Sequence, residues 1–105
     1  MIEVSNIGKY EIRVCGHAGA APYGQDIVCS GVSALVLALV EMLERCKDEL
    51  TEYDVTVENG NAHINVVPRT EFERELAGAF FAIRCGFENI ALLYPQFVNI
   101  IQKNA

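Results

Sequence analysis

The chain has 105 residues and a mass of 11.6 kDa, which is the size of one domain. Because 51% of the residues are apolar, the chain can build a core without disulfides or a structural metal. Fourteen acidic residues outnumber eight basic ones and give a net charge of −6. The sequence has no cluster of Lys and Arg of the kind that phosphate binding requires, so we expect no nucleic acid partner. A basic peptide or protein is a better match for this charge.

The sequence also predicts a cytoplasmic protein without a membrane partner. Its N-terminus carries no basic stretch followed by an apolar core, as a signal peptide would. The longest apolar run, residues 32–40, is far shorter than the roughly 20 residues that cross a bilayer. The four cysteines are Cys15, Cys29, Cys46 and Cys85. They form no CxxC pair, so we expect free thiols and neither a metal site nor a disulfide.

Alternating apolar and polar residues predict two strands at the start of the chain. The first covers residues 2–5, a turn follows at 6–9, and the second strand covers 10–15. We expect the two strands to pair as a hairpin. Residues 16–25 are rich in Gly and Ala, lose the alternation and predict a loop.

A helix is predicted from Asp26, a good N-cap residue, to about Lys47. Until Glu41 the helix is apolar around most of its circumference, so it must be covered on more than one side. A sheet can cover one side. The remainder requires a second helix or a second copy of the protein, and we therefore expect a homodimer formed largely through this helix.

The second half of the chain begins with another hairpin. Residues 53–58 and 62–66 alternate in polarity on either side of Asn59-Gly60, the strongest short hairpin signal. Pro68 ends the second of these strands.

A second long helix and a short strand complete the chain. Thr70 and Glu73 are spaced as a capping box that opens the helix, which runs through Gly86 until Pro95 stops it. A last strand is predicted at 97–101. The order β-β-α-β-β-α-(β) favours one two-layer α+β domain spanning residues 1–105. In it, two long helices cover one face of a mainly antiparallel sheet of four to five strands.

One segment combines a histidine at the end of a strand with a cysteine in the first turn of a helix. The free N–H groups and the dipole of a helix start stabilise an anion, which favours the thiolate of Cys29. The imidazole of His17 would favour it further, because a Cys–His pair can exist as thiolate and imidazolium. The helix-start N–H groups also suit the oxyanion of a tetrahedral intermediate. The plainer alternative is a buried helical cysteine and a strand-end histidine with ordinary hydrogen bonds.

Residues 16–35 resemble the signature of the ribosomal-processing cysteine protease family Prp. The segment has a Gly-His-Ala start at Gly16, a small-residue loop, then Gly-x-Asp-Ile-Val-Cys ending at Cys29, with Val-Ser-Ala-Leu continuing the helix. The two hairpins and the final helix, which ends in Tyr-Pro-Gln-Phe-Val, match the layout of the family. The resemblance therefore covers essentially the whole chain.

The resemblance implies a cysteine endopeptidase that removes the N-terminal extension of a large-subunit ribosomal protein, with no metal or organic cofactor. It assigns the nucleophile to Cys29 and the general base to His17. A role of a different class stays open, namely a non-catalytic, dimeric, ribosome-associated binding or assembly factor in which Cys29 is incidental.

Four further residues match supporting positions of the family. Asp26 is implied to support the site by orienting His17, although an N-cap role is equally available to it. Ser33 lies one helical turn after Cys29 on the same face, and its alternative is a bond to a carbonyl of its own helix. Gly16 and Gly24 match loop glycines that let the loop open and close.

The remaining candidates have structural explanations. His63 lies on the polar face of a strand and is expected in solvent. Packing is expected for Cys15, Cys46 and Cys85, and for the helical stripe of Phe72, Phe80 and Phe87.

Overall fold

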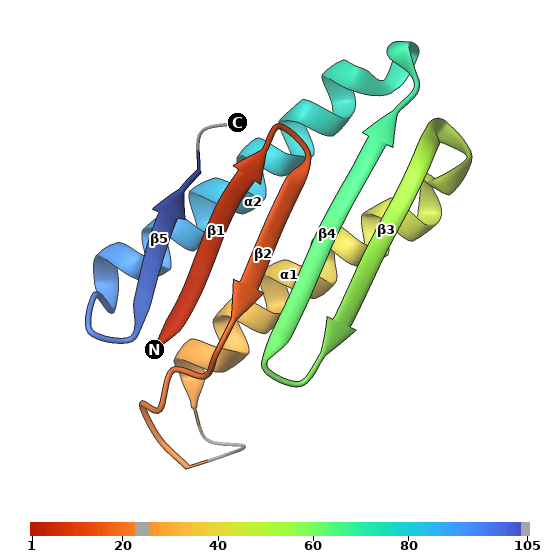
Figure 1. Cartoon of the computed structure of the whole chain (residues 1–105). Helices are drawn as coiled ribbons and strands as arrows, with labels where there is room; N and C mark the ends of the chain where they lie inside the picture. Colours follow the sequence, from red (N-terminus) through yellow and green to blue (C-terminus); the bar gives the residue numbers. More distant parts are fainter. Residues whose placement is uncertain (23–25, 104–105) are drawn as a thin grey trace.

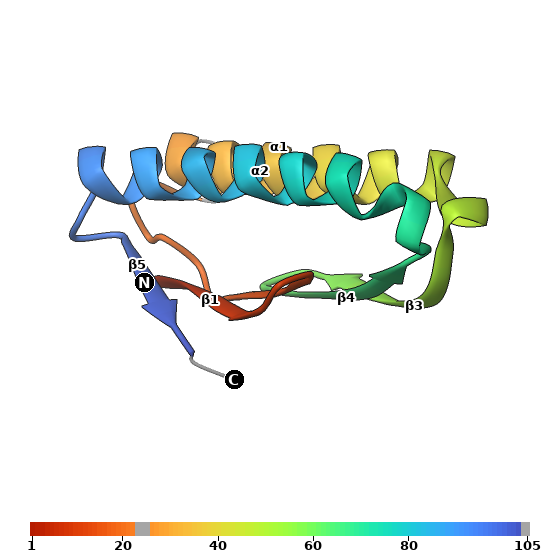
Figure 2. The same cartoon turned by 90° about the horizontal axis from the view of Figure 1, so that it is seen from above.

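Two helices cover one face of a five-stranded sheet in the computed structural model, which describes residues 1–22 and 26–103 (Figure 1, Figure 2). The strands are β1 (Ile2–Gly8), β2 (Glu11–Cys15), β3 (Leu50–Glu58), β4 (Asn61–Pro68) and β5 (Val98–Gln102). The helices are α1 (Ile27–Arg45) and α2 (Glu73–Leu93), and single 3-10 turns occur at Lys47–Glu49 and Thr70–Phe72. The predicted two-layer α+β architecture is confirmed.

The strands are ordered β3-β4-β2-β1-β5 across the sheet. All neighbours are antiparallel except β1 and β5, which run parallel, so the sheet is mainly antiparallel as predicted. Because β2 pairs with β4, the end of β2 meets the turn between β3 and β4. Cys15 pairs there with Asn61, and the N–H of Gly16 donates to the carbonyl of Gly60 at 2.9 Å. This junction places the loop after β2 against the β3–β4 turn.

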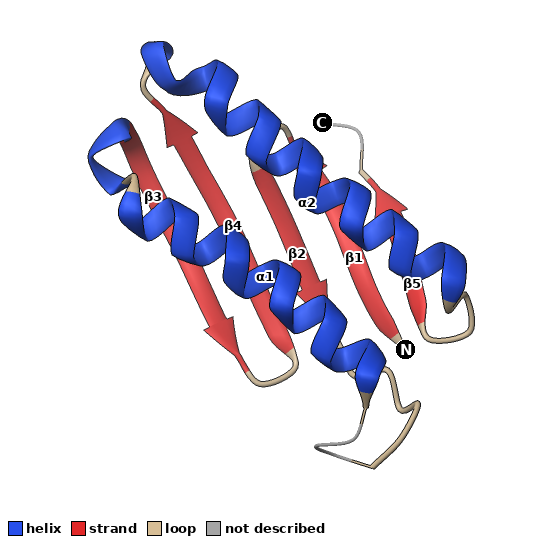
Figure 3. Cartoon of the chain, turned by 180° about the vertical axis from the view of Figure 1, so that it is seen from behind, coloured by secondary structure: helices blue, strands red, loops and turns tan. Residues whose placement is uncertain are grey.

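Both helices lie along the same face of the sheet (Figure 3). Each buries one stripe of side chains. In α1 the stripe recurs every three or four residues, as a helix with one covered face requires. It consists of Val28, Val32, Val36, Leu39 and Leu43. In α2 the buried residues are Leu76, Phe80 and Phe87, which confirms most of the predicted phenylalanine core, while Phe72 is half-buried. On length and hydropathy alone both helices are apolar enough to cross a membrane, but here both lie along the sheet.

The two helices also contact each other, at a position where α2 has no side chain. A Cβ on Gly86 would lie 2.8 Å from both methyl carbons of Leu35. The glycine therefore provides the space that Leu35 occupies. This contact covers one flank of α1, so part of the apolar circumference of this helix is buried within the single chain.

Two local predictions are wrong. The first turn is not at 6–9, because β1 continues to Gly8, paired with β2 on one side and with β5 on the other. A central strand held on both edges overrides the turn preference of Asn and Gly. The capping box at Thr70 and Glu73 does not form either. The chain makes a 3-10 turn there, and the N-cap of α2 is Phe72, without a side-chain hydrogen bond.

Two side-chain expectations also fail. His63 is not free in solvent, since its Nε2 lies 2.7 Å from Oε2 of Glu11 across the β2–β4 pair and its side chain is only 17% exposed. Cys85 is exposed on α2 rather than packed. Both residues depend on neighbours that are distant in the sequence, so local alternation could not reveal their environments.

Candidate active site

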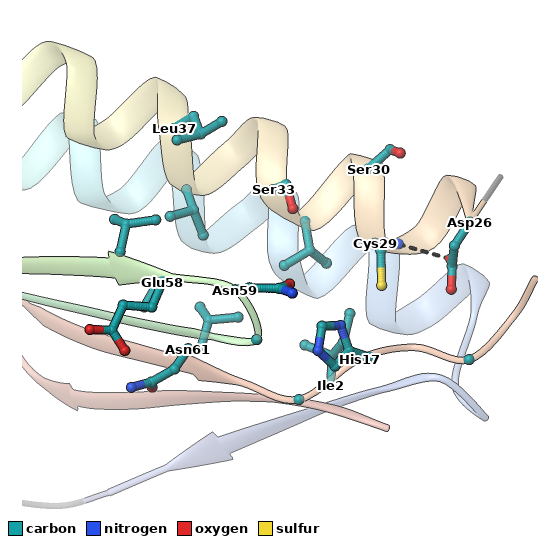
Figure 4. A pocket seen from close by; sticks show the side chains of 18 of the residues that line it. Ile2, His17, Asp26, Cys29, Ser30, Ser33, Leu37, Glu58, Asn59 and Asn61 are labelled. Atoms are coloured by element: carbon teal, nitrogen blue, oxygen red, sulfur yellow. Dashed lines mark hydrogen bonds between the residues drawn. The ribbon is translucent and has the colours of Figure 1, made fainter. Parts of the chain in front are cut away.

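A cavity of about 620 Å³ opens where the loop after β2, the start of α1 and the β3–β4 turn meet (Figure 4). His17 enters it from the loop, and Cys29 enters it from α1. Ser33 and Leu37 follow Cys29 by four and eight positions. Because a helix turns by 100° per residue, they lie on the same side of α1 as Cys29 and also line the cavity. The structure therefore brings together the two residues that the sequence singled out for chemistry.

Asp26 fixes the first turn of α1. Its carboxylate Oδ1 accepts hydrogen bonds from the N–H groups of Val28 and Cys29, both at 3.0 Å, which confirms the predicted N-cap. Its Oδ2 accepts the N–H of Ala20 at 3.0 Å, so the same side chain also ties the loop to the helix. The hydrogen bond from the Cys29 backbone is the main cause that lowers the pKa of Asp26. Burial opposes it, while the bonds from Ala20, from the Cys29 side chain and from Val28 add to it.

These hydrogen bonds bear on two expectations, namely that the helix-start N–H groups bind an oxyanion and that Asp26 orients His17. The N–H groups of Val28 and Cys29 are occupied by Asp26, so they are not free donors for an oxyanion. Within the residues that the structure describes, no hydrogen bond joins Asp26 to His17. The geometry thus shows that Asp26 caps α1 and holds the loop to the helix through its bond from Ala20.

The sulfur of Cys29 is half-buried and accepts a hydrogen bond from the loop. The backbone N–H of Ala18, the residue after His17, donates to Sγ at 3.2 Å. Ala18 itself is buried, with 5% of its surface exposed, so this donor is held in place. This main-chain N–H stabilises negative charge on the sulfur, while the N–H groups of the first turn of α1 are used by Asp26.

His17 is exposed at the mouth of the cavity. Its carbonyl accepts a hydrogen bond from the backbone nitrogen of Met1 at 2.7 Å, and its ring lies against Gly60 in the β3–β4 turn. In the described part of the chain, no hydrogen bond connects its imidazole with the Cys29 sulfur. Catalytic hydrogen bonds are often long without substrate and tighten only in the substrate complex. The arrangement is that of a Cys–His pair sharing one cavity before substrate binds.

The supporting residues of the sequence analysis differ in position. Ser33 is exposed on the wall of the cavity, one turn from Cys29, and Figure 4 shows its hydroxyl directed into it. Gly16 has φ +97° and no room for a Cβ, because Met1 O occupies that space. It therefore forms a tightly packed turn in the structure. Gly24 lies outside the described residues.

The β3–β4 turn supplies site residues that sequence reasoning missed. Glu58, Asn59, Gly60 and Asn61 all line the cavity, although the sequence indicated only a hairpin there. The signal was the Asn-Gly pair itself, but nothing local showed that this turn faces the histidine loop. Among the described residues, no group of three His, Cys, Asp or Glu side chains is arranged to hold a metal ion.

The family and the fold are shared with known proteins. The model of the family described as cysteine protease Prp matches residues 1–99. A curated relative named ribosomal processing cysteine protease Prp, from Staphylococcus aureus, is 32% identical over 76 residues, which are 71% of this chain and 72% of the relative.

Two solved structures resemble this one over nearly their whole length. The S. aureus protease Prp with a covalently linked product peptide has a TM-score of 0.78 at 21% identity, with 97% of each chain covered. The protein SMU.848 from Streptococcus mutans has a TM-score of 0.74 at 28% identity, with 100% of this chain and 96% of that one covered. On the family match and the 32% identity, this chain belongs to the cysteine protease Prp family.

Proposed function

We propose that Cys29 is the nucleophile and His17 the general base of this protease. The assignment rests on the surroundings of the Cys29 sulfur. Sγ of Cys29 lies at the start of α1, accepts the N–H of Ala18 at 3.2 Å and shares its cavity with His17. Cys15 and Cys46 do not line this cavity, and Cys85 is exposed in the middle of α2.

The chemistry follows from these positions. His17 takes the proton of the Cys29 thiol, and the thiolate attacks the scissile carbonyl to form a tetrahedral intermediate. The protonated imidazole then gives its proton to the leaving amine, and water hydrolyses the thioester. Asp26 acts on this sequence indirectly, because it holds the backbone of Cys29 and, through Ala20, the loop that carries His17.

The substrate we propose is the N-terminal extension of a large-subunit ribosomal protein. The name of the S. aureus relative, a ribosomal processing protease, supports this class of substrate. The cavity supports it as well, since Val36, Leu37 and Val57 give it an apolar wall and Glu58 adds a carboxylate. An apolar peptide segment next to a basic one complements both, and ribosomal proteins are commonly basic because they bind RNA.

The partners that accompany this function are a peptide and a second copy of the chain. A homodimer through the outer side of α1 is supported by Ile27, which is 69% exposed and lies outside the buried stripe of this helix. The net charge of −6 supports a cytoplasmic enzyme that binds neither nucleic acid nor a membrane surface directly. Proton transfer and thiolate attack need no metal or organic cofactor.

Incubation with the full-length ribosomal protein of the same organism, followed by intact-mass analysis, tests the proposal. The expected result is loss of a single N-terminal fragment with the wild-type enzyme and no loss with Cys29→Ala. Cys85→Ala is the matched control, because Cys85 is also a free thiol but lies on the far helix. Cleavage by Cys29→Ala at the wild-type rate would refute the assignment of the nucleophile.

A further inference from the structure

Gly60 belongs to the cavity but has no role in the chemistry described above. It lies in the β3–β4 turn with φ +78°, a left-handed conformation that glycine adopts without strain. Its carbonyl accepts the N–H of Gly16 at 2.9 Å. The turn is therefore bonded to the residue directly before His17.

The imidazole of His17 occupies the space that a side chain at position 60 would need. A Cβ on Gly60 would lie 2.7 Å from Nε2 and 3.3 Å from Cε1 of His17. Relaxed contacts between non-bonded carbon atoms are about 3.5 Å or longer, so the ring would have to move. A rigid ring cannot yield at one end as a flexible aliphatic chain does. Figure 4 shows the ring between the turn residues Asn59 and Asn61 on one side and Cys29 on the other.

We propose that Gly60 is a positioning residue for His17. Its missing side chain gives the imidazole its place in the cavity of Cys29, and the bond from Gly16 holds the turn and the histidine loop in register. This inference rests on the proposed function, since it takes His17 as the base. In the step that Gly60 serves, the S–H bond of Cys29 breaks, an N–H bond forms on the ring, and the electron pair stays on sulfur. A displaced ring receives this proton less readily.

Few other titratable groups share the cavity. Those among its described lining residues are Asp26 and Glu58, apart from the Cys–His pair itself. Asp26 uses both carboxylate oxygens on backbone N–H groups. Two charged groups lie beside the pair, because the amino group of Met1 donates to the carbonyl of His17 at 2.7 Å and the side chain of Cys29 also bonds to Asp26. Both groups are present in the wild type and in Gly60→Ala, so a difference between their Cys29 pH profiles that disappears in the His17→Ala background reports the histidine.

The test is the rate of Cys29 alkylation by iodoacetamide between pH 5 and 9, resolved by peptide mass spectrometry because three other free cysteines are present. We expect Gly60→Ala to slow alkylation near neutral pH by roughly fivefold to tenfold, which lies within the range of couplings between contacting residues, and to shift the profile toward that of His17→Ala. In a His17→Ala background, Gly60→Ala should change the rate by less than about twofold. Hydrolysis of the ribosomal protein should lose kcat with little change in KM.

Gly19→Ala measures backbone strain alone. Gly19 also has a positive φ, +70°, but a Cβ there would meet nothing within 4 Å. If Gly60→Ala slows Cys29 no more than Gly19→Ala does, or slows it equally with and without His17, the positioning role is refuted. Faster alkylation would also refute it, since Gly60 would then hold the ring away from the sulfur.

A second variant keeps the test open if Gly60→Ala does not fold. Gly60→Asn tolerates a positive φ at low cost yet still places a Cβ against the ring. The same fivefold to tenfold loss is expected, with Gly19→Asn as its control.

The outcomes also separate this inference from the proposed function. If His17→Ala itself leaves alkylation and hydrolysis unchanged, the assignment of the base fails, whereas an effect of His17→Ala without a coupled effect of Gly60 refutes only this inference.

Discussion

The backbone N–H of Cys29 donates to Oδ1 of Asp26 at 3.0 Å, while Oδ2 of the same carboxylate accepts the N–H of Ala20. One buried side chain thereby fixes the start of α1 and the loop that approaches it. The consequence is local rigidity around one sulfur, because Ala18, next to His17 in that loop, donates to Sγ of Cys29. The cap, the histidine loop and the sulfur of Cys29 are thus parts of one hydrogen-bonded unit.

Removal of either member of the reactive pair should abolish cleavage without unfolding the protein. We expect His17→Ala to lower kcat by about 10²–10⁴-fold, the usual contribution of a general base, and Cys29→Ala to leave no measurable turnover. The double variant should be no slower than Cys29→Ala, because residues that act as a unit are not additive. Intact-mass kinetics on the ribosomal protein measures this, with circular dichroism as the control for folding. Cleavage by His17→Ala at the wild-type rate, or measurable turnover by Cys29→Ala, would contradict this prediction.

Asp26→Asn and Asp26→Ala should separate the two roles of Asp26, which are the N-cap of α1 and the hydrogen bond to the loop at Ala20. Asn can still accept the N–H groups of Val28 and Cys29, but its amide nitrogen cannot accept from Ala20. We expect Asp26→Ala to lower Tm by about 4–8 °C through loss of the cap, with Asp26→Asn losing less Tm than Asp26→Ala and reduced in turnover. Thermal melts and cleavage rates of the two variants provide the measurement. Equal Tm losses in both variants would argue against the cap as the main contribution to stability.

The same carboxylate should make stability depend on acid pH. Since folding lowers the pKa of Asp26 below its ordinary value of 3.8, the unfolded chain binds the proton more tightly. The stabilisation is therefore fully present well above pH 3.8 and is lost as the pH falls through the folded value. Urea unfolding between pH 2.5 and 7 should show the advantage of wild type over Asp26→Asn shrinking below about pH 4. Parallel curves for the two proteins over this range would contradict the prediction.

The parts of this structure that the sequence predicted are those that depend on near neighbours. Asp26 as an N-cap and the hairpin at Asn59-Gly60 follow from short-range hydrogen bonding and turn geometry. The placement of His17 and Cys29 at a strand end and a helix start likewise followed from local periodicity and capping.

The missed features all arise from contacts between distant segments. Gly60 was interpreted only as a turn residue, because its contact with His17 exists only once β4 pairs with β2. Three basic residues that are distant in the sequence also come together only in the fold. Lys9, Arg84 and Lys103 form no cluster in the sequence, yet they line a second cavity of about 370 Å³ at the opposite end of β1. The parallel β5 also needed the whole sheet, since its partner is the first strand.

The apolar outer side of α1 leads to the last prediction, a homodimer. At 100° per residue, Ile27, Ala34 and Ala38 lie within about 20° of one line along the helix, away from the buried stripe. All three are exposed, and Ile27 has 69% of its surface in solvent. Small residues in line with a large apolar one allow a second helix to approach closely, and a two-fold axis is the commonest way to pair such faces. Because this helix starts at Asp26 and carries Cys29, the same contact would steady the nucleophile.

Sedimentation equilibrium at micromolar concentration should give the mass of two chains for the wild type. Ala34→Arg places a charge in the centre of this face and should give the mass of one chain. Ala82→Arg introduces the same charge on the exposed side of α2, near Phe81, and should leave the dimer intact. A wild-type mass of one chain across the concentration range would rule out the dimer. A dimer that survives Ala34→Arg but dissociates with Ala82→Arg would move the interface to α2, where Phe81 and Leu92 are 69% and 78% exposed.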